Sequence, residues 1–159
     1  MTATALLSLL LMACAVVPPG PGSLQAEVLR QWGPPTARHA LPGGALRLEY
    51  ATGPFGRTTW MLELDAGGRV TQAQQVLAKR ALWALQPRLP GMARAELLQT
   101  LGTPGNRGSG GRQGGEIWSW RFETSECLWF RVSIGNDLRV RDGGFYPDPS
   151  CDGGPNGFH

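Results

Sequence analysis

The residue types that most often perform acid–base or metal chemistry are scarce in this chain. His39 and His159 are its two histidines, and neither has a Cys, Asp or Glu at the spacing of a metal site. No serine lies in the glycine-flanked turn that presents a catalytic nucleophile, and the carboxylates stand singly among arginines, as on solvated strand faces. The sequence therefore predicts that the protein is not an enzyme, and it predicts no metal, no cofactor and no small-molecule substrate.

The three cysteines predict covalent chemistry of another kind. Cys14 ends the run Leu11-Met12-Ala13-Cys14, which resembles a bacterial lipobox, where the cysteine is diacylated and becomes the mature N-terminus. Cys127 and Cys151 then remain as a pair, and in an oxidising compartment they predict one disulfide. Closing that loop would stabilise the second half of the chain by roughly 3 kcal/mol. The alternative is two buried free thiols.

The N-terminal segment predicts export. Residues 1–17 are apolar, and the run breaks at Pro18-Pro19-Gly20 before it reaches the roughly 20 apolar residues that a spanning helix needs. No Lys or Arg precedes the run, and Met12 is bulky for its position in a lipobox. Ordinary signal peptidase cleavage near Ala13 or Ala15 is therefore the alternative, and it would leave a soluble periplasmic protein.

Composition limits the class of partner. The net charge is +3, but the basic residues are scattered, so no nucleic-acid groove is indicated. The chain is 42% hydrophobic, which is enough for a packed core, and its 23 glycines and 13 prolines predict short elements joined by many turns. The glycine-rich stretch 105–115 lacks the Lys-Ser/Thr end of a phosphate-binding loop and is expected to be a flexible connection.

One stretch of the sequence occurs twice. Residues 89–104 read as an amphipathic helix that is stopped by Gly102 and Pro104, and residues 21–35 match it with Gly33 in the place of Gly102, 69 positions earlier (102 − 33). Strand residues follow at an offset of 70, so that Leu48 falls on Trp118 (118 − 48). A regular offset through helix and strands predicts an internal duplication, with each half forming one structural unit.

Each half is expected to be a helix packed on three antiparallel strands. Alternating residues place Leu48 and Tyr50 in the core, with Arg47 and Glu49 on the wet face. A small sheet with one apolar face must be covered, and the amphipathic helix is the available cover. The predicted helices are 22–33, 76–86 and 93–101, and the predicted strands are 45–51, 58–65, 69–76, 116–123, 126–134 and 138–145, with a connecting loop over 36–44. The helix at 76–86 has no counterpart in the first half.

The fold class predicted is α+β, in two tandem repeats. The expected divisions are a lipoprotein-type signal peptide over 1–13, a linker over 14–21, the first repeat over 22–76, a connecting helix with the second repeat over 77–146, and a Gly/Pro-rich tail with Cys151 over 147–159.

Five apolar residues are candidates for a partner surface. Trp129 and Ile117 point away from the core in the expected register, and Trp83, Phe145 and Tyr146 can join them on the outside. The alternative is that the two repeats bury these side chains against each other.

A series of short motifs resembles the SmpA/OmlA lipoproteins, the family of BamE. The motifs are Leu89-Pro90-Gly91-Met92, Glu96-Leu97-Leu98, Leu101-Gly102-Thr103-Pro104, Gly114-Gly115, Trp118-Ser119-Trp120 and Leu138-Arg139-Val140. The first half keeps Gly33-Pro34-Pro35, Gly43-Gly44, Leu48-Glu49-Tyr50 and Gly68-Arg69-Val70. The best-known members of the family carry a single copy, whereas this chain carries two.

The resemblance implies two helices packed on a three-stranded sheet and a non-enzymatic role in the machine that inserts β-barrel proteins into the outer membrane. Its partners would be outer-membrane assembly proteins. A lipidated Cys14 fits that family, and Ala15 is compatible with sorting to the outer membrane, where the protein would face the periplasm.

A tandem pair of α+β units is also similar to the architecture of the β-lactamase inhibitor protein, in which the sheet faces of both repeats grip an enzyme. That similarity implies a periplasmic or secreted protein-binding module. It needs no anchor, but it needs exposed aromatic side chains along a shared concave surface.

Overall fold

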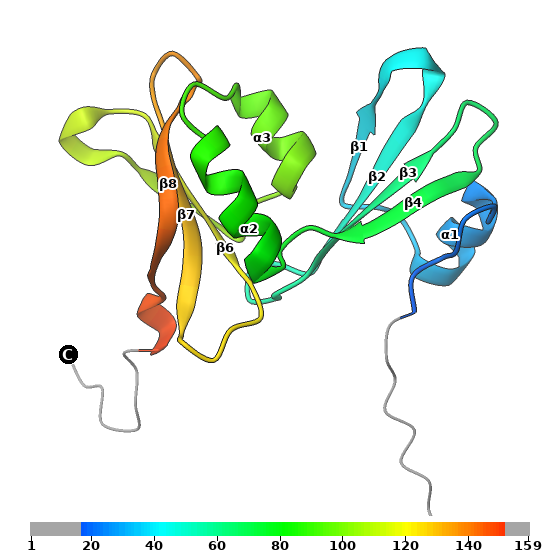
Figure 1. Ribbon diagram of the computed structural model, residues 1–159, viewed down its shortest axis with the longest axis horizontal. Coiled ribbons are helices and arrows are strands. Elements are labelled where there is room, and N and C mark those ends of the chain that lie inside the picture. The colour runs from blue at the N-terminus through cyan, green and yellow to red at the C-terminus, as the bar shows by residue number, and fades with distance from the viewer. Residues whose placement is uncertain (1–16, 152–159) are drawn as a thin grey trace, which may run out of the picture.

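A computed structural model describes residues 17–151, in which two α+β units follow one another along the chain (Figure 1). The predicted signal peptide 1–13, the predicted lipidation site Cys14 and the tail beyond Cys151 lie outside the described residues. The first unit contains α1 (Gln25–Trp32), β1 (Ala37–Ala40), β2 (Leu46–Ala51), β3 (Thr59–Leu64) and β4 (Val70–Gln75). The second contains α2 (Lys79–Leu85), α3 (Arg94–Leu101), β5 (Asn106–Ser109), β6 (Glu116–Arg121), β7 (Leu128–Ile134) and β8 (Val140–Pro147). Four short 3-10 helices lie at Pro42–Gly44, Gln86–Arg88, Gly111–Gln113 and Pro149–Cys151.

The mixed α+β class is confirmed, but the prediction of three-stranded sheets is wrong. Each unit has a four-stranded antiparallel sheet, in the order β1-β2-β3-β4 and β5-β6-β7-β8. The added strands β1 and β5 lie in the stretches 36–44 and 105–115, which were expected to be loops. All four residues of β5 are exposed, so the strand has no apolar alternation and is held by backbone pairing with β6.

The helices α1 and α3 end in the same way. Gly33 and Gly102 follow them with φ of 75° and 78° and extended ψ, a conformation that is essentially restricted to glycine. Each glycine donates its N–H to the carbonyl four residues earlier, that of Leu29 or Leu98. Leu24 is the N-cap of helix α1, and its N–H donates to the Glu27 carboxylate at 2.8 Å.

Strand pairing repeats at the sequence offset of 70. Leu46 pairs with Leu64 between β2 and β3, and Glu116 pairs with Ile134 between β6 and β7. The next pairing in each sheet has a register shift at the equivalent place. In β3–β4 it lies between Glu63 and Leu64, and in β7–β8 it lies between Ser133 and Ile134. The two sheets therefore share register as well as strand order.

The two units have cores of different size. The core of the first unit lies between its sheet and α1 and consists of Val28, Leu48, Leu62, Leu64 and Val70. The core of the second unit lies between its sheet and the helices α2 and α3, and it is rich in aromatic residues. Its buried members are Leu77, Leu82, Leu85, Leu89, Met92, Leu97, Leu101, Trp118, Trp120, Phe122, Phe130, Val132, Ile134 and Val140.

Helices α2 and α3 lie between the two sheets, and α1 lies on the far side of the first sheet (Figure 1). Arg47 of β2 donates from Nη1 to the carbonyl of Gln99 in α3 at 2.6 Å. Glu49 accepts the N–H of Thr103, just after α3, at 2.7 Å. Glu49 is therefore completely buried, and its predicted position on a wet face is wrong, because that face packs toward the second unit.

Candidate functional site

Arginine and aromatic side chains alternate on the outer face of the second sheet, the face turned away from α2 and α3. The guanidinium carbon of Arg121 lies 5.5 Å from the centre of the Trp129 ring. The guanidinium carbon of Arg131 lies 5.7 Å from Trp129 and 5.1 Å from the ring of Tyr146. We call these four residues the arginine–aromatic stack. At these distances cation–π attraction favours this arrangement of the side chains.

The five residues predicted to form one partner surface occupy two different faces. Trp129, Ile117 and Tyr146 lie on the outer face of the sheet, where Tyr146 is 42% exposed and Ile117 is half-buried. Trp129 is only 9% exposed, because the arginines on either side cover its ring. Phe145 lies on the opposite face, and Trp83, which is 58% exposed, stacks against it with ring centres 5.2 Å apart.

The position of Phe145 follows from the register of β8. Phe145 pairs with Phe130 across the sheet, and paired residues point to the same face. Its ring lies 5.2 Å from Phe130 and 5.5 Å from Phe122, both of which are buried core residues. Placing Phe145 on an outer surface with Trp129 and Tyr146 was therefore wrong.

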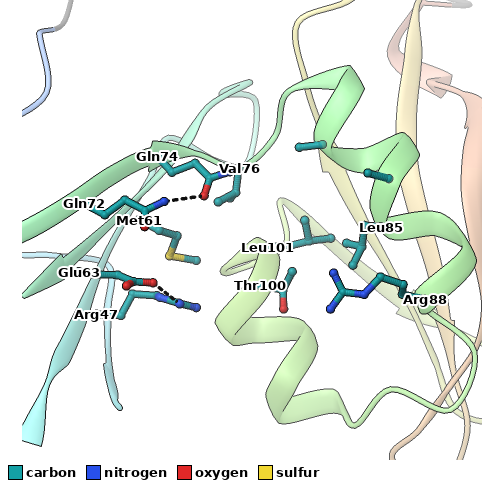
Figure 2. A pocket seen from close by; sticks show the side chains of 12 residues that line it. Arg47, Met61, Glu63, Gln72, Gln74, Val76, Leu85, Arg88, Thr100 and Leu101 are labelled. Carbon is teal, nitrogen blue, oxygen red and sulfur yellow. Dashed lines mark hydrogen bonds and ion pairs between the residues drawn. The ribbon is translucent and has the colours of Figure 1, made fainter. Parts of the chain in front are cut away.

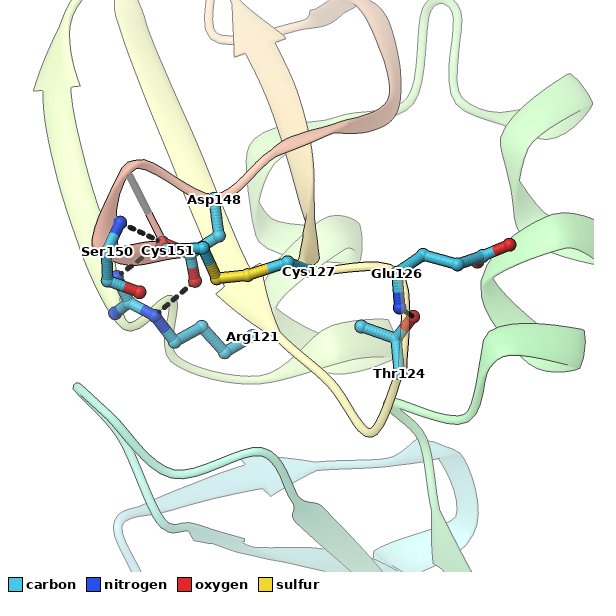
Figure 3. The surroundings of a disulfide bond; sticks show 7 residues. All are labelled: Arg121, Thr124, Glu126, Cys127, Asp148, Ser150 and Cys151. Carbon is cyan, nitrogen blue, oxygen red and sulfur yellow. Dashed lines mark hydrogen bonds and ion pairs between the residues drawn. A yellow bond between two sulfur atoms is a disulfide. The ribbon is translucent and has the colours of Figure 1, made fainter. Parts of the chain in front are cut away.

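A disulfide joins Cys127 to Cys151 in the structure, as predicted (Figure 3). The Cα atoms are 6.3 Å apart, within the usual range for a disulfide. Cys127 precedes β7, and Cys151 ends the last 3-10 helix, so the disulfide ties the C-terminal segment to the start of the inner strand β7.

An ion pair lies beside the disulfide (Figure 3). Arg121 donates from Nε and Nη2 to the two carboxylate oxygens of Asp148, at 2.6 and 3.0 Å. Burial raises the pKa of Asp148, but the hydrogen bonds from Arg121 and Ser150 and the charge of Arg121 outweigh it and hold that pKa below its usual value. Arg121 also donates from Nη1 to the carbonyl of Pro54 at 3.0 Å, which connects the ion pair to the first unit.

The first unit contains an open apolar hollow that sequence reasoning missed. It has a volume of about 620 Å³ and lies where α1 ends beside β2 and β3. The ring of Trp32 meets Tyr50 edge-on at 5.1 Å and Trp60 at 6.0 Å, and all three rings are partly exposed. We call it the aromatic hollow; its lining residues are Trp32, Pro34, Thr36, Tyr50, Ala51, Thr52, Thr58 and Trp60. The sequence feature that could have indicated this hollow is the lack, in the first half, of a counterpart to the helix predicted at 76–86.

A cleft of about 420 Å³ separates the first sheet from α2 and α3 (Figure 2). At one end, Arg47 and Arg88 approach from opposite units, and Arg47 forms an ion pair with Glu63. Within the described residues, Arg47 Nε has no hydrogen-bond partner. Met61 and Leu101 form part of the apolar lining, so the cleft offers positive charge beside an apolar wall.

His39 has a partner that its sequence neighbours do not indicate. Antiparallel pairing of β1 with β2 brings its Nε2 within 3.0 Å of the buried Glu49 Oε2. The other carboxylate oxygen of Glu49 accepts the N–H of Thr103, so the pair lies where the two units meet. Within residues 17–151, no three His, Cys, Asp or Glu side chains come together in a way that could hold a metal ion.

No family model and no curated protein matches the chain. Among solved structures, a cysteine-rich secretory protein (SAV1118) from Staphylococcus aureus subsp. aureus Mu50 is similar over 82% of this chain and 44% of that chain, at 10% identity and a TM-score of 0.28. The chain thus spans less than half the length of that protein, and a similarity of this size carries no argument about fold or function. Across residues 17–151, no helix has both the length and the apolar character needed to cross a membrane.

Proposed function

We propose that this protein is a non-enzymatic outer-membrane lipoprotein that binds components of the β-barrel assembly machinery, as its resemblance to the SmpA/OmlA lipoproteins implies. In this proposal Cys14 carries the lipid, and the two units project into the periplasm. The role is accessory: the protein holds partners together and has no reaction of its own.

The observation that carries the proposal is the arginine–aromatic stack. Arg, Trp and Tyr are the residue types that most often dominate the binding energy of protein interfaces. Here they alternate across the second sheet, with Trp129 and Tyr146 directly paired between β7 and β8. Because stacking already restrains these side chains, they would lose less of their own conformational entropy when a partner binds.

The arrangement of the second unit supports the family resemblance. Helices α2 and α3 cover one face of the strands β6, β7 and β8, as the resemblance implies, and β5 is an addition at the edge. The opposite face of these strands is the one that carries the arginine–aromatic stack.

The arrangement of the sheets favours this proposal over an inhibitor-like function. A grip by both sheets would need their outer faces to form one continuous surface. The outer face of the first sheet instead turns toward α2 and α3, where Arg47 contacts Gln99 and Glu49 contacts Thr103.

Cross-linked pull-down from cell envelopes tests the proposal. We expect the wild-type protein to recover barrel-assembly components, and a Cys14→Ser variant to recover none above background. The double substitution Arg131→Ala with Tyr146→Ala should reduce recovery at least fivefold, whereas Arg80→Ala, which removes an exposed arginine from α2, should not. Equal recovery by the wild type and the Cys14→Ser variant would contradict the proposal.

A further inference from the structure

The two units can be compared residue by residue at the ends of their helices. The Tyr50 hydroxyl donates to the carbonyl of Gly33 at 3.1 Å. Trp120, 70 residues later (120 − 50), donates from its indole N–H to the carbonyl of Gly102, also at 3.1 Å. The same contact, made by two different side chains, shows that these positions are structurally equivalent.

Helix α2 and Leu77, two residues before it, cover this region in the second unit. Leu101, Trp120 and Phe130 are the equivalents of Trp32, Tyr50 and Trp60, and they are 2%, 1% and 0% exposed. They share one core with Leu77, Leu82 and Leu85. The apolar side of α2 is therefore the cover that makes the second unit a closed structure.

The first unit has no such cover within residues 17–151. Helix α1 is the one helix described on that face of the first sheet (Figure 1). Trp32, Tyr50 and Trp60 are consequently left partly exposed around the aromatic hollow. The hollow thus corresponds to the position that α2 fills in the second unit.

The residues of the hollow indicate the chemistry of its occupant. Thr52 and Thr58 stand where the second unit has Phe122 and Leu128, so the occupant must supply apolar bulk at this end. Arg38 pairs with Leu48 and so shares this face of the sheet. Burial raises the pKa of Tyr50, and the positive charge of Arg38 partly opposes that shift. A matching helix therefore has an apolar face flanked by acidic residues.

We propose that the aromatic hollow binds an amphipathic helix of a partner protein, with acidic residues beside its apolar face, in the place that α2 occupies in the second unit. This mode of recognition places apolar side chains of one helix face into a hydrophobic groove. The inference goes beyond the proposed function, because it uses a different unit and does not depend on the arginine–aromatic stack.

The α2 segment itself provides the probe. A labelled peptide of residues 76–88 carries Arg80→Lys and Ala84→Glu, whose side chains are condensed into a lactam, with loss of water, to hold it helical. It is titrated with the full-length protein and followed by fluorescence anisotropy. An acidic version of the peptide carries Lys79→Glu and Arg88→Glu. We expect saturable binding of both peptides, with the acidic one at least threefold tighter, and we expect Arg38→Gln in the protein to abolish that preference.

Substitutions in the protein locate the site. Trp60→Ala should weaken peptide binding at least tenfold, whereas Trp83→Ala, which removes an exposed tryptophan from the second unit, should change it less than twofold. If Trp60→Ala prevents folding, Thr58→Glu places a charge at the hollow and should give the same tenfold loss, with Thr71→Glu as the exposed control. The double substitution Arg131→Ala with Tyr146→Ala should leave peptide binding unchanged. A negative result for the peptide can therefore be told apart from a negative result in the pull-down.

Three results would overturn the inference. The first is no saturable binding to the wild-type protein, and the second is equal affinity for the Trp60→Ala and Trp83→Ala variants. The third comes from a photo-cross-linker in place of Thr58, which we expect to capture the added peptide. Capture of residues 1–16 of the same chain, or of a second copy of the chain, would show that the hollow has another occupant.

Discussion

The first and second units share strand order, strand register and helix ends, yet the second is closed and the first is open. In the second unit, α2 completes a core in which Trp118, Trp120, Phe122 and Phe130 are fully buried. In the first unit, Trp32, Tyr50 and Trp60 remain partly exposed. One backbone plan can therefore serve as a stable body in one copy and as a binding surface in the other.

The two units also differ at the position that joins them. Glu49 in β2 and Ser119 in β6 are equivalent, and both are buried. Glu49 is buried by contact with the end of α3, through Thr103. Ser119 belongs to the outer face of the second sheet, where no further unit of the described chain packs. The first unit therefore has a buried carboxylate at the junction, where the second unit has a serine.

The largest effect is expected when the two helix-ending glycines are compared. Gly33→Ala should lower the free energy of unfolding by about 1–3 kcal/mol, because alanine is strained at this φ and ψ. Gly102→Ala should cost about 1–3 kcal/mol more, because its added Cβ would lie 2.9 Å from Glu49 Cδ and from Thr59 Cγ2, whereas Gly33 faces open space. Urea unfolding of both variants measures the difference. Equal losses would mean that Glu49 and Thr59 move aside freely.

The disulfide should contribute to the second unit alone. Its cysteines are 24 residues apart, and replacing both in Cys127→Ser with Cys151→Ser should destabilise that unit by roughly 3 kcal/mol on the chain-entropy model. Thermal unfolding with and without a reductant measures this loss. The reductant should lower the melting temperature of the wild type and leave the double variant unchanged. Two free thiols in the unreduced wild-type protein would contradict the prediction.

The ion pair of Asp148 should make the second unit sensitive to acid. Because the folded state lowers the pKa of Asp148, the pair stabilises the protein above the usual carboxyl pKa, and this contribution is lost as the pH falls below about 4. Asp148→Asn should cost about 1–2 kcal/mol at neutral pH and flatten the acid dependence. Unfolding measured from pH 7 to pH 3 checks this, with the exposed Asp142→Asn as control. If Asp148→Asn leaves the pH dependence of unfolding unchanged, the ion pair is not the cause of the loss of stability in acid.

The smallest effect concerns the hydrogen bond that occurs once in each unit, from a strand side chain to the carbonyl of the glycine that follows the helix. Tyr50→Phe removes the hydrogen bond to the Gly33 carbonyl and should lower the free energy of unfolding by about 0.5–1.5 kcal/mol. Tyr146→Phe is the control, because Tyr146 is an exposed residue, and its effect should stay within about 0.5 kcal/mol. If the two substitutions have equal effects, the hydroxyl of Tyr50 does not help to hold the end of α1.

Several features of the fold follow from short stretches of sequence. The repeated glycines at 33 and 102 predict where two helices end, because few other residues adopt their backbone conformation. The alternation through Leu46, Leu48 and Tyr50 predicts a strand and its core face. In contrast, β5 has no apolar pattern and exists because its backbone pairs with β6, so the sequence predicted a loop there.

The sequence by itself determined the duplication, the helix ends and the pairing of two cysteines, since these depend on local backbone preference, periodicity and count. Only the tertiary structure decided that Glu49 is buried beside His39, that Phe145 packs against the core, and that the first unit keeps an open hollow. These features depend on how the second unit packs against the first sheet and on which residues face each other across strands. Burial is set by neighbours that are distant in sequence, and no local pattern specifies them.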